Sequence, residues 1–114
     1  MKIKVYVSGP YTGGDVVLNV RDAVHAADVL LKAGYAPYCP HLSHFWHLLY
    51  PHDYEDWLDL DMEWVTACDC MLRIPGISSG ADRETEHAIE LGQPVFDNIS
   101  ELRAYYEESS DPQI

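Results

Sequence analysis

The sequence is poor in basic residues and has no long apolar run. Lysine and arginine together number 7 against 19 acidic residues, which gives a formal net charge of -12. Because neutralisation of phosphates supplies most non-specific affinity for DNA and RNA, we expect no nucleic acid polymer as partner. No apolar stretch approaches the roughly 20 residues needed to cross a bilayer, and the N-terminus lacks a signal-peptide pattern. We therefore expect a cytoplasmic protein without a membrane partner.

Cysteine is also scarce, since the 114 residues contain only 3. Cys39, Cys68 and Cys70 each lie in an apolar segment, which predicts reduced core thiols instead of a disulfide framework. The length predicts one domain, over residues 1–108, followed by a flexible tail at 109–114. A chain this short is small for an enzyme that must enclose a pocket alone, so a homo-oligomer is expected.

The pattern of residues 2–40 predicts a parallel α/β unit. Residues 2–8 alternate and are rich in β-branched side chains, as a strand requires, and they lead into a glycine-rich loop at 9–14. Asp15 is the expected N-cap of a helix that ends at Gly34, and residues 35–39 form a second strand. Further strands at 69–74 and 93–96 and helices at 53–67, 81–91 and 99–108 complete a single-domain Rossmann-like or flavodoxin-like parallel sheet flanked by helices.

Two small-residue loops follow predicted strands and are candidate ligand loops. Their backbone N–H groups can approach a ligand closely, and the second loop leads into a helix N-terminus. The first loop lacks the full dinucleotide glycine pattern and the Walker lysine, so no cofactor is predicted. The candidate substrate-binding residues in these loops are Gly9, Pro10, Tyr11, Gly13, Ser78, Ser79 and Gly80.

Glu84 is the charged residue that the 81–91 helix turns toward the core. At about 100° per residue, it falls within the inner arc of the helix. An unpaired buried carboxylate is costly, which indicates a functional use or a partner. The apolar or weakly polar residues predicted to share this arc are Ala81, Thr85, Ala88, Ile89 and Leu91.

Asp61 is the corresponding inward carboxylate of the 53–67 helix. Two inward carboxylates in one small domain favour acid, base or nucleophile chemistry, because burial and mutual repulsion make one easier to ionise than the other. Alternatively, each caps a loop or pairs with an arginine. The apolar face predicted around Asp61 consists of Tyr54, Trp57, Leu58, Trp64, Val65 and Cys68.

Residues 40–50 combine aromatic side chains with His41, His44 and His47. One interpretation is a pocket wall where rings and imidazoles meet a nucleobase. Another is a plain core or interface segment. A metal site is the third, although on one helix the first and last imidazole would diverge by about 240°. We predict no metal, and residues 45–50 are the candidate interface.

Three segments resemble the nucleoside 2-deoxyribosyltransferase family, in particular its 2'-deoxynucleoside 5'-monophosphate N-glycosidase branch. They are VYVSGPYTGG, DLDMEWVTACD and SSGADRETEHAIELGQPV, and the resemblance covers residues 3–96. It implies that Glu84 is the nucleophile, with Asp61 and Tyr6 as catalytic partners. Residues 41–47 resemble an uncharacterised subgroup of unknown function found in phages and bacteria.

The resemblance implies cleavage of an N-glycosidic bond, or base transfer, on a nucleoside or nucleoside 5'-monophosphate. Ser78 and Gly80 would then meet the sugar or phosphate. It also implies pockets completed by a neighbouring chain. The alternatives are a non-catalytic nucleotide-binding or sensing module and, third, a metal-dependent hydrolase.

Overall fold

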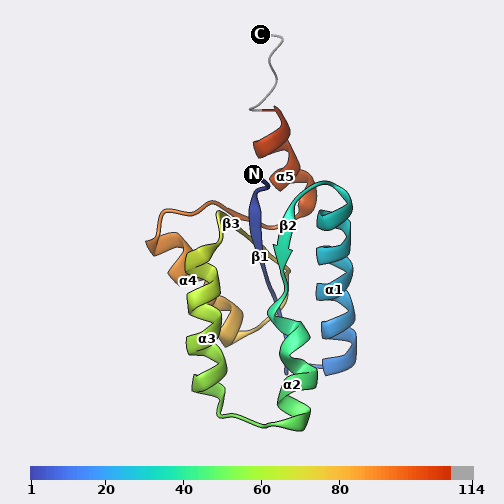
Figure 1. Cartoon of the computed structure of the whole chain (residues 1–114), viewed down its shortest axis with the longest axis vertical. Helices are drawn as coiled ribbons and strands as arrows, with labels where there is room; N and C mark the ends of the chain where they lie inside the picture. The colour runs from blue at the N-terminus through green and yellow to red at the C-terminus, as the bar shows by residue number, and fades with distance from the viewer. Residues whose placement is uncertain (109–114) are drawn as a thin grey trace.

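A computed structural model describes residues 1–108 of the chain, which form one α/β domain with an all-parallel sheet (Figure 1). The expected fold class is therefore confirmed, whereas the predicted tail at 109–114 lies outside the described residues. The strand order β2-β1-β3-β4 is that of flavodoxin-like sheets, in which ligands bind where the order reverses, beside β1 and β3. The strands are β1 (Lys4–Ser8), β2 (Ala36–Tyr38), β3 (Cys70–Arg73) and β4 (Val95–Phe96).

The helices lie on both sides of this sheet, and α1 lies opposite α3 and α4 (Figure 1). Residues 40–49, which follow β2, form a 3₁₀ turn that continues into a short helix. The expected helix at 99–108 is α-helical only in its first half and then widens to a π-helical turn. The helical elements are α1 (Val16–Lys32), η1 (Pro40–Ser43), α2 (His44–Leu49), α3 (Tyr54–Ala67), α4 (Ser79–Glu90), α5 (Ile99–Arg103) and η2 (Ala104–Glu108).

Alternation along β1 divides the core into two layers. Val5 and Val7 face the side covered by α1 and α5, where they join Leu30 and Leu102. Tyr6 faces the other side, in a cluster that includes residues of α3 and α4. Ser8 is two residues beyond Tyr6 and is fully buried, so β1 presents two polar side chains to the α3 and α4 side.

The start of α4 is fixed by Ser78, whose Oγ accepts a hydrogen bond of 3.1 Å from the backbone N–H of Ala81. This cap starts the helix two residues before the predicted position, so the loop between β3 and α4 is correspondingly short. The N-terminus of α4 therefore lies close to the carboxyl end of β3, which places Glu84 beside the sheet.

Some apolar residues predicted to face the core are exposed instead. Ile89 and Leu91 are 62% and 45% exposed, because they lie at the end of α4, where the helix gives way to the turn before β4. Trp64 is 43% exposed and stacks on Tyr38 at the surface, with ring centroids 4.8 Å apart. Of the residues predicted to lie on the inner face of α4, only Ala81, Glu84 and Ala88 are buried.

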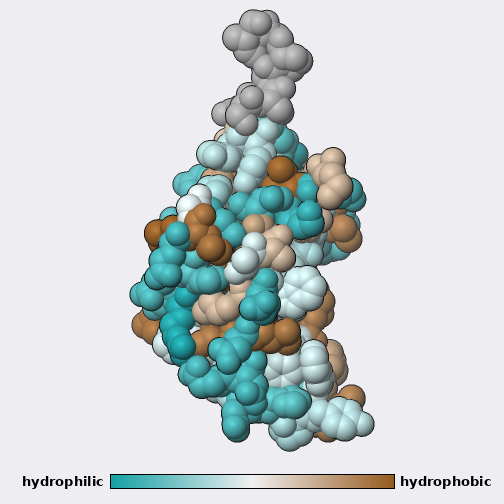
Figure 2. Space-filling view, turned by 60° about the vertical axis from the view of Figure 1, so that its left-hand side comes forward, coloured by the Kyte–Doolittle hydropathy of each residue, from teal (hydrophilic) through white to brown (hydrophobic). Residues whose placement is uncertain are grey.

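The face that carries α3 and α4 is covered largely by hydrophilic side chains, with hydrophobic patches between them (Figure 2). This distribution agrees with the excess of acidic over basic residues. No helix within residues 1–108 combines the length and the apolar character needed to span a bilayer.

Candidate functional site

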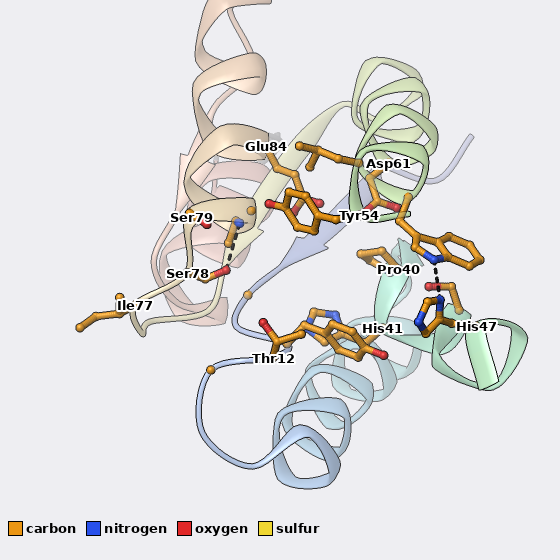
Figure 3. A pocket seen from close by; sticks show the side chains of 18 of the residues that line it. Thr12, Pro40, His41, His47, Tyr54, Asp61, Ile77, Ser78, Ser79 and Glu84 are labelled. Atoms are coloured by element: carbon orange, nitrogen blue, oxygen red, sulfur yellow. Dashed lines mark hydrogen bonds between the residues drawn. The ribbon is translucent and has the colours of Figure 1, made fainter. Parts of the chain in front are cut away.

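A cavity of about 570 Å³ opens at the carboxyl ends of β1 and β3, at the position expected for a ligand in this topology. The two ligand loops, the start of α4, the segment around η1 and α2, and one side of α3 surround it (Figure 3). The lining residues are Gly9, Tyr11, Thr12, Gly13, Pro40, His41, Ser43, His47, His52, Tyr54, Trp57, Leu58, Asp61, Ile77, Ser78, Ser79, Gly80, Ala81 and Glu84.

Glu84 is held at the wall of this cavity by both of its carboxylate oxygens. Its side chain is buried, and Tyr6 Oη donates a hydrogen bond of 2.9 Å to Oε2. Ser8 Oγ donates a second hydrogen bond, of 2.7 Å, to Oε1. Two side chains of β1 therefore fix the orientation of the Glu84 carboxyl in the cavity wall.

Tyr6 is suited to remain a donor at every accessible pH. Burial raises the pKa of its hydroxyl far above the usual range, and the nearby charges of Glu84 and Asp61 add to that increase. The hydroxyl therefore stays protonated and keeps its hydrogen bond to Glu84. In this arrangement Tyr6 lies behind Glu84 and does not line the cavity.

Asp61 projects from α3 toward Glu84 (Figure 3). Burial, the charge of Glu84 and a hydrogen bond to Glu84 together raise the pKa of the Asp61 carboxyl to about 8, and burial contributes most. Asp61 is thus protonated at neutral pH and donates to Glu84. Among residues 1–108 neither carboxyl takes part in an ion pair with a basic side chain, so the alternative of an arginine partner has no support.

The pair places a protonated carboxyl beside an oriented carboxylate in one cavity. Such a pair can supply a proton from one group while the other acts as base or nucleophile. Separation of two carboxyls into an acid and an anion is a common property of catalytic sites, although structural pairs show it as well.

The loop after β1 contributes three of its four predicted residues to the cavity. Gly9, Tyr11 and Gly13 line it, whereas Pro10 does not. The carbonyl of Pro10 instead accepts a hydrogen bond of 2.9 Å from His41 Nε2. Pro10 therefore supports the cavity wall through His41.

Ser78, Ser79 and Gly80, which the sequence marks as candidate substrate-binding residues, all line the cavity. Ile77 also borders it, but its side chain points away into solvent and is 98% exposed (Figure 3). Gly80 packs against the aromatic wall, since a Cβ atom at this position would lie 2.9 Å from Tyr54 Oη. A larger residue at Gly80 would narrow the cavity between α3 and α4.

The three histidines of residues 40–50 make separate contacts. His41 is buried and bonded to Pro10, and burial lowers the pKa of its imidazole, so the ring is neutral. His44 does not line the cavity; its Nδ1 shares a hydrogen bond with the hydroxyl of Tyr11. In the described part of the chain, no group of three His, Cys, Asp or Glu side chains is placed to hold a metal ion.

His47 has a ring orientation that its neighbours fix. Trp57 Nε1 donates a hydrogen bond of 2.8 Å to His47 Nδ1 (Figure 3). The backbone N–H of His52 donates to the same atom at 3.3 Å. An indole N–H can only donate, so Nδ1 carries a lone pair. The ring proton of the neutral imidazole is then on Nε2, which makes His47 a hydrogen-bond donor for a ligand in the cavity that it lines.

Four residues important to this geometry were not predicted as site residues. Ser8 could have been identified by strand periodicity, because it follows Tyr6 by two residues and must share its face. Tyr54 and Trp57 were predicted as core, but they form the aromatic wall. His52 lies between the aromatic segment at 40–50 and the predicted helix at 53–67, where no sequence signal marks it.

The cavity has no lysine or arginine among the residues 1–108 that line it. Its polar groups are two carboxyls, hydroxyls, imidazoles and the backbone N–H groups of the small-residue loops. A neutral or weakly charged ligand fits this lining better than a polyanion.

The comparison with curated proteins finds no match. The sequence profile of one family, described as Domain of unknown function (DUF7768), matches residues 3–98. This range includes both ligand loops, α3, α4 and every residue that lines the cavity. The chain therefore belongs to the DUF7768 family.

Proposed function

We propose that this protein cleaves, or transfers the base across, the N-glycosidic bond of a nucleoside or nucleoside 5'-monophosphate. The observation that carries the proposal is the Asp61 and Glu84 pair, in which one carboxyl is protonated and the other is oriented by Tyr6 and Ser8. The resemblance of the Glu84 segment to nucleoside 2-deoxyribosyltransferases supports the same chemistry.

In the proposed reaction, a carboxylate oxygen of Glu84 attacks C1' of the sugar. The C1'–N bond breaks, its electron pair goes to the base, and the carboxyl proton of Asp61 neutralises the departing base. A glycosyl ester on Glu84 results. Water, deprotonated by the Asp61 carboxylate, then attacks C1' and releases the sugar and Glu84, or an acceptor base takes the place of water.

The aromatic end of the cavity is the proposed site of the base. Trp57 and Tyr54 provide flat apolar surfaces, and His47 Nε2 supplies a fixed donor for a base acceptor. The small-residue loops would face the sugar. The lack of a lysine or arginine in the described lining favours a nucleoside over its monophosphate.

A homo-oligomer in the cytoplasm is part of the proposal. The three cysteines are unpaired and buried, as is usual in a reducing compartment. Residues 45–50, beside the cavity, include several exposed apolar side chains and remain a candidate contact surface. Those exposed by half or more are Phe45, Trp46, Leu48, Leu49 and Tyr50.

The second candidate is a nucleotide-binding or sensing module without turnover. The hydrogen bond between Asp61 and Glu84 favours it, because a carboxyl pair that satisfies itself can serve recognition alone. Thermal shift separates the two candidates: ligand-dependent stabilisation without base release would support the binding module.

The direct test is to incubate the protein with deoxynucleosides, ribonucleosides and their 5'-monophosphates and to follow base release by chromatography. We expect release from at least one nucleoside and loss of activity by about 1,000-fold or more in Glu84→Gln, because an amide is a poor nucleophile. Glu90→Gln, an exposed position on the same helix, is the matched control. No release from any compound, or an active Glu84→Gln variant, would refute the proposal.

A further inference from the structure

Helix α1 carries an apolar stripe that is largely exposed in the described part of the chain. Val17 is 70% exposed, Val24 36% and Leu31 55%. Val20 and Ala27 lie between them and are partly buried, and Ala27 packs against the core. The helix buries a separate face through Ala23, Ala26 and Leu30, which is centred about 110° around the helix from the centre of the stripe. Most of the stripe is therefore additional to the surface that the fold requires.

The spacing of the stripe is that of a helix-pairing surface. Its members, at positions 17, 20, 24, 27 and 31, follow alternating steps of three and four residues. At about 100° per residue they fall within an arc of about 80°. This repeat is the a and d pattern of coiled coils, which places apolar side chains along one seam between two helices.

Charged residues beside the stripe distinguish the two possible directions of pairing. Arg21 lies three residues before Val24, and Asp28 lies four residues after it, on the same flank of α1. In a parallel pair, two-fold symmetry places the flanks that carry Arg21 and Asp28 on opposite sides of the seam, so these two charges do not meet. In an antiparallel pair centred on Val24, each Arg21 lies next to the partner's Asp28, which makes two attractive contacts.

Both charges are exposed and can make such a contact in addition to the ion pairs that they already form on α1. The Arg21 and Asp22 side chains are 73% and 59% exposed and 3.7 Å apart, so their ion pair is loose. Asp28 pairs with Lys32 at 3.0 Å, and its side chain is 52% exposed, so it can accept from a second cation. The stripe and its flanking charges on α1 are therefore complementary to the same surface of a second α1 helix. A second copy of this chain, related by two-fold symmetry, supplies that surface.

We propose that the protein forms a homodimer in which the α1 helices of two copies pack antiparallel around Val24. Val17 of one protomer lies opposite Leu31 of its partner, and the two Val24 side chains meet at the symmetry axis. α1 and the α3 and α4 pair lie on opposite sides of the sheet, so both cavities stay open in this dimer (Figure 1).

The test is the mass of the full chain in solution, measured by sedimentation velocity and light scattering at about 100 μM. We expect twice the chain mass of 12.9 kDa for the wild-type protein and the monomer mass for Val24→Glu. Leu18→Glu is the matched control, because Leu18 is 46% exposed but lies about 100° from Val17 around the helix. It should remain dimeric.

A charge exchange tests the antiparallel direction and does not depend on a change in the stripe. Arg21→Asp and Asp28→Arg should each weaken the dimer by about 10-fold or more, and the double variant should restore it. A monomeric wild-type protein, failure of the double variant to restore the dimer, or dissociation by Leu49→Glu but not by Val24→Glu would overturn the proposal. Circular dichroism confirms that each variant is folded.

Discussion

The carboxyl of Asp61 on α3 is hydrogen-bonded to that of Glu84 on α4, which adds a buried contact to the exposed ones between these helices, such as Thr66 with His87. Burial and the charge of Glu84 keep a proton on Asp61 up to a pH of about 8, because they raise the Asp61 pKa to about that value. The same carboxyl in an unfolded chain releases its proton near pH 4. Folding therefore retains a proton over several pH units.

The retained proton makes stability depend on pH. A group whose pKa is raised by folding contributes stability that is present below the unfolded pKa and is lost as pH rises through the folded pKa, here from about 4 to about 8. We expect the unfolding free energy of the wild type to fall, relative to Asp61→Asn, by at most about 1.4 kcal/mol per pH unit in this range.

Urea denaturation at several pH values between 5 and 8.5 measures this difference. Asp59→Asn, an exposed position on the same helix, is the control and should follow the wild type. A free-energy difference between wild type and Asp61→Asn that is constant with pH would show that Asp61 does not hold the proton.

Activity should depend on the same proton in the proposed reaction. Base release should decline above pH 8, because the ionised form of Asp61 has no proton for the departing base. Asp61→Asn should lower kcat by about 100-fold or more with an ordinary nucleoside, and by much less with an analogue whose base leaves readily. An equal loss for both substrates would contradict the role of Asp61 as acid.

The two donors on β1 should affect the chemical step more than binding. Ser8→Ala removes the 2.7 Å hydrogen bond to Glu84 Oε1, and Tyr6→Phe removes the 2.9 Å bond to Oε2. Each leaves a buried carboxylate oxygen without its donor, at a cost of about 1–3 kcal/mol of stability. We expect a lower kcat with a nearly unchanged KM, measured by initial rates.

The exposed Ser100→Ala is the control for these variants and should change neither quantity. If Ser8→Ala raised KM alone, the hydroxyl would contact substrate instead of orienting Glu84.

The fold was predictable from the sequence to a greater extent than the site. Period-two alternation in β1 and the capped helix that follows it are local patterns, and they were sufficient for a parallel α/β sheet. The strand order was not predictable, because it is decided by contacts between distant segments such as Val5 with Cys70. Local patterns likewise do not specify which residues meet across a cavity.

The inward orientation of Glu84 was predictable because one helix face decides it. Ile89 and Leu91 shared the predicted face but are exposed, since a helical projection does not include where the supporting sheet ends. Trp57 was predicted to be buried by its hydrophobicity, whereas its indole N–H serves His47 at the cavity. Polar functions of aromatic residues depend on a partner that local periodicity cannot identify.

Removal of the Trp57 indole N–H should weaken the preference of His47 for one tautomer. Trp57→Phe retains an aromatic ring but leaves His47 Nδ1 with only the longer hydrogen bond from the His52 backbone, so the second neutral tautomer becomes more accessible. ¹⁵N chemical shifts of the imidazole should show protonated Nε2 in the wild type and a mixture in the variant. KM for the nucleoside should rise several-fold. Trp46→Phe, whose ring contacts Trp57 edge-on, is the control.

The loop between β3 and α4 should tolerate a side chain at Gly76 poorly. Gly76 has a φ of +133°, and a Cβ atom there would lie 2.6 Å from Cγ of Pro10. Gly76→Ala should lower the unfolding free energy by about 1–3 kcal/mol. Gly13→Ala is the control, because its Cβ would meet only the Ile77 carbonyl, at 3.5 Å. Equal losses in both variants would contradict this explanation.

Attachment of both Glu84 oxygens to β1 also decides which partner moves in the proposed reaction. A carboxylate held by Ser8 and Tyr6 cannot travel toward the sugar without breaking a buried hydrogen bond. The base is held by the aromatic wall and the carboxylate by the sheet, so the bond exchange becomes a passage of the anomeric carbon between two stationary groups. The pocket then needs space around the sugar, which the glycines and serines of the two loops provide.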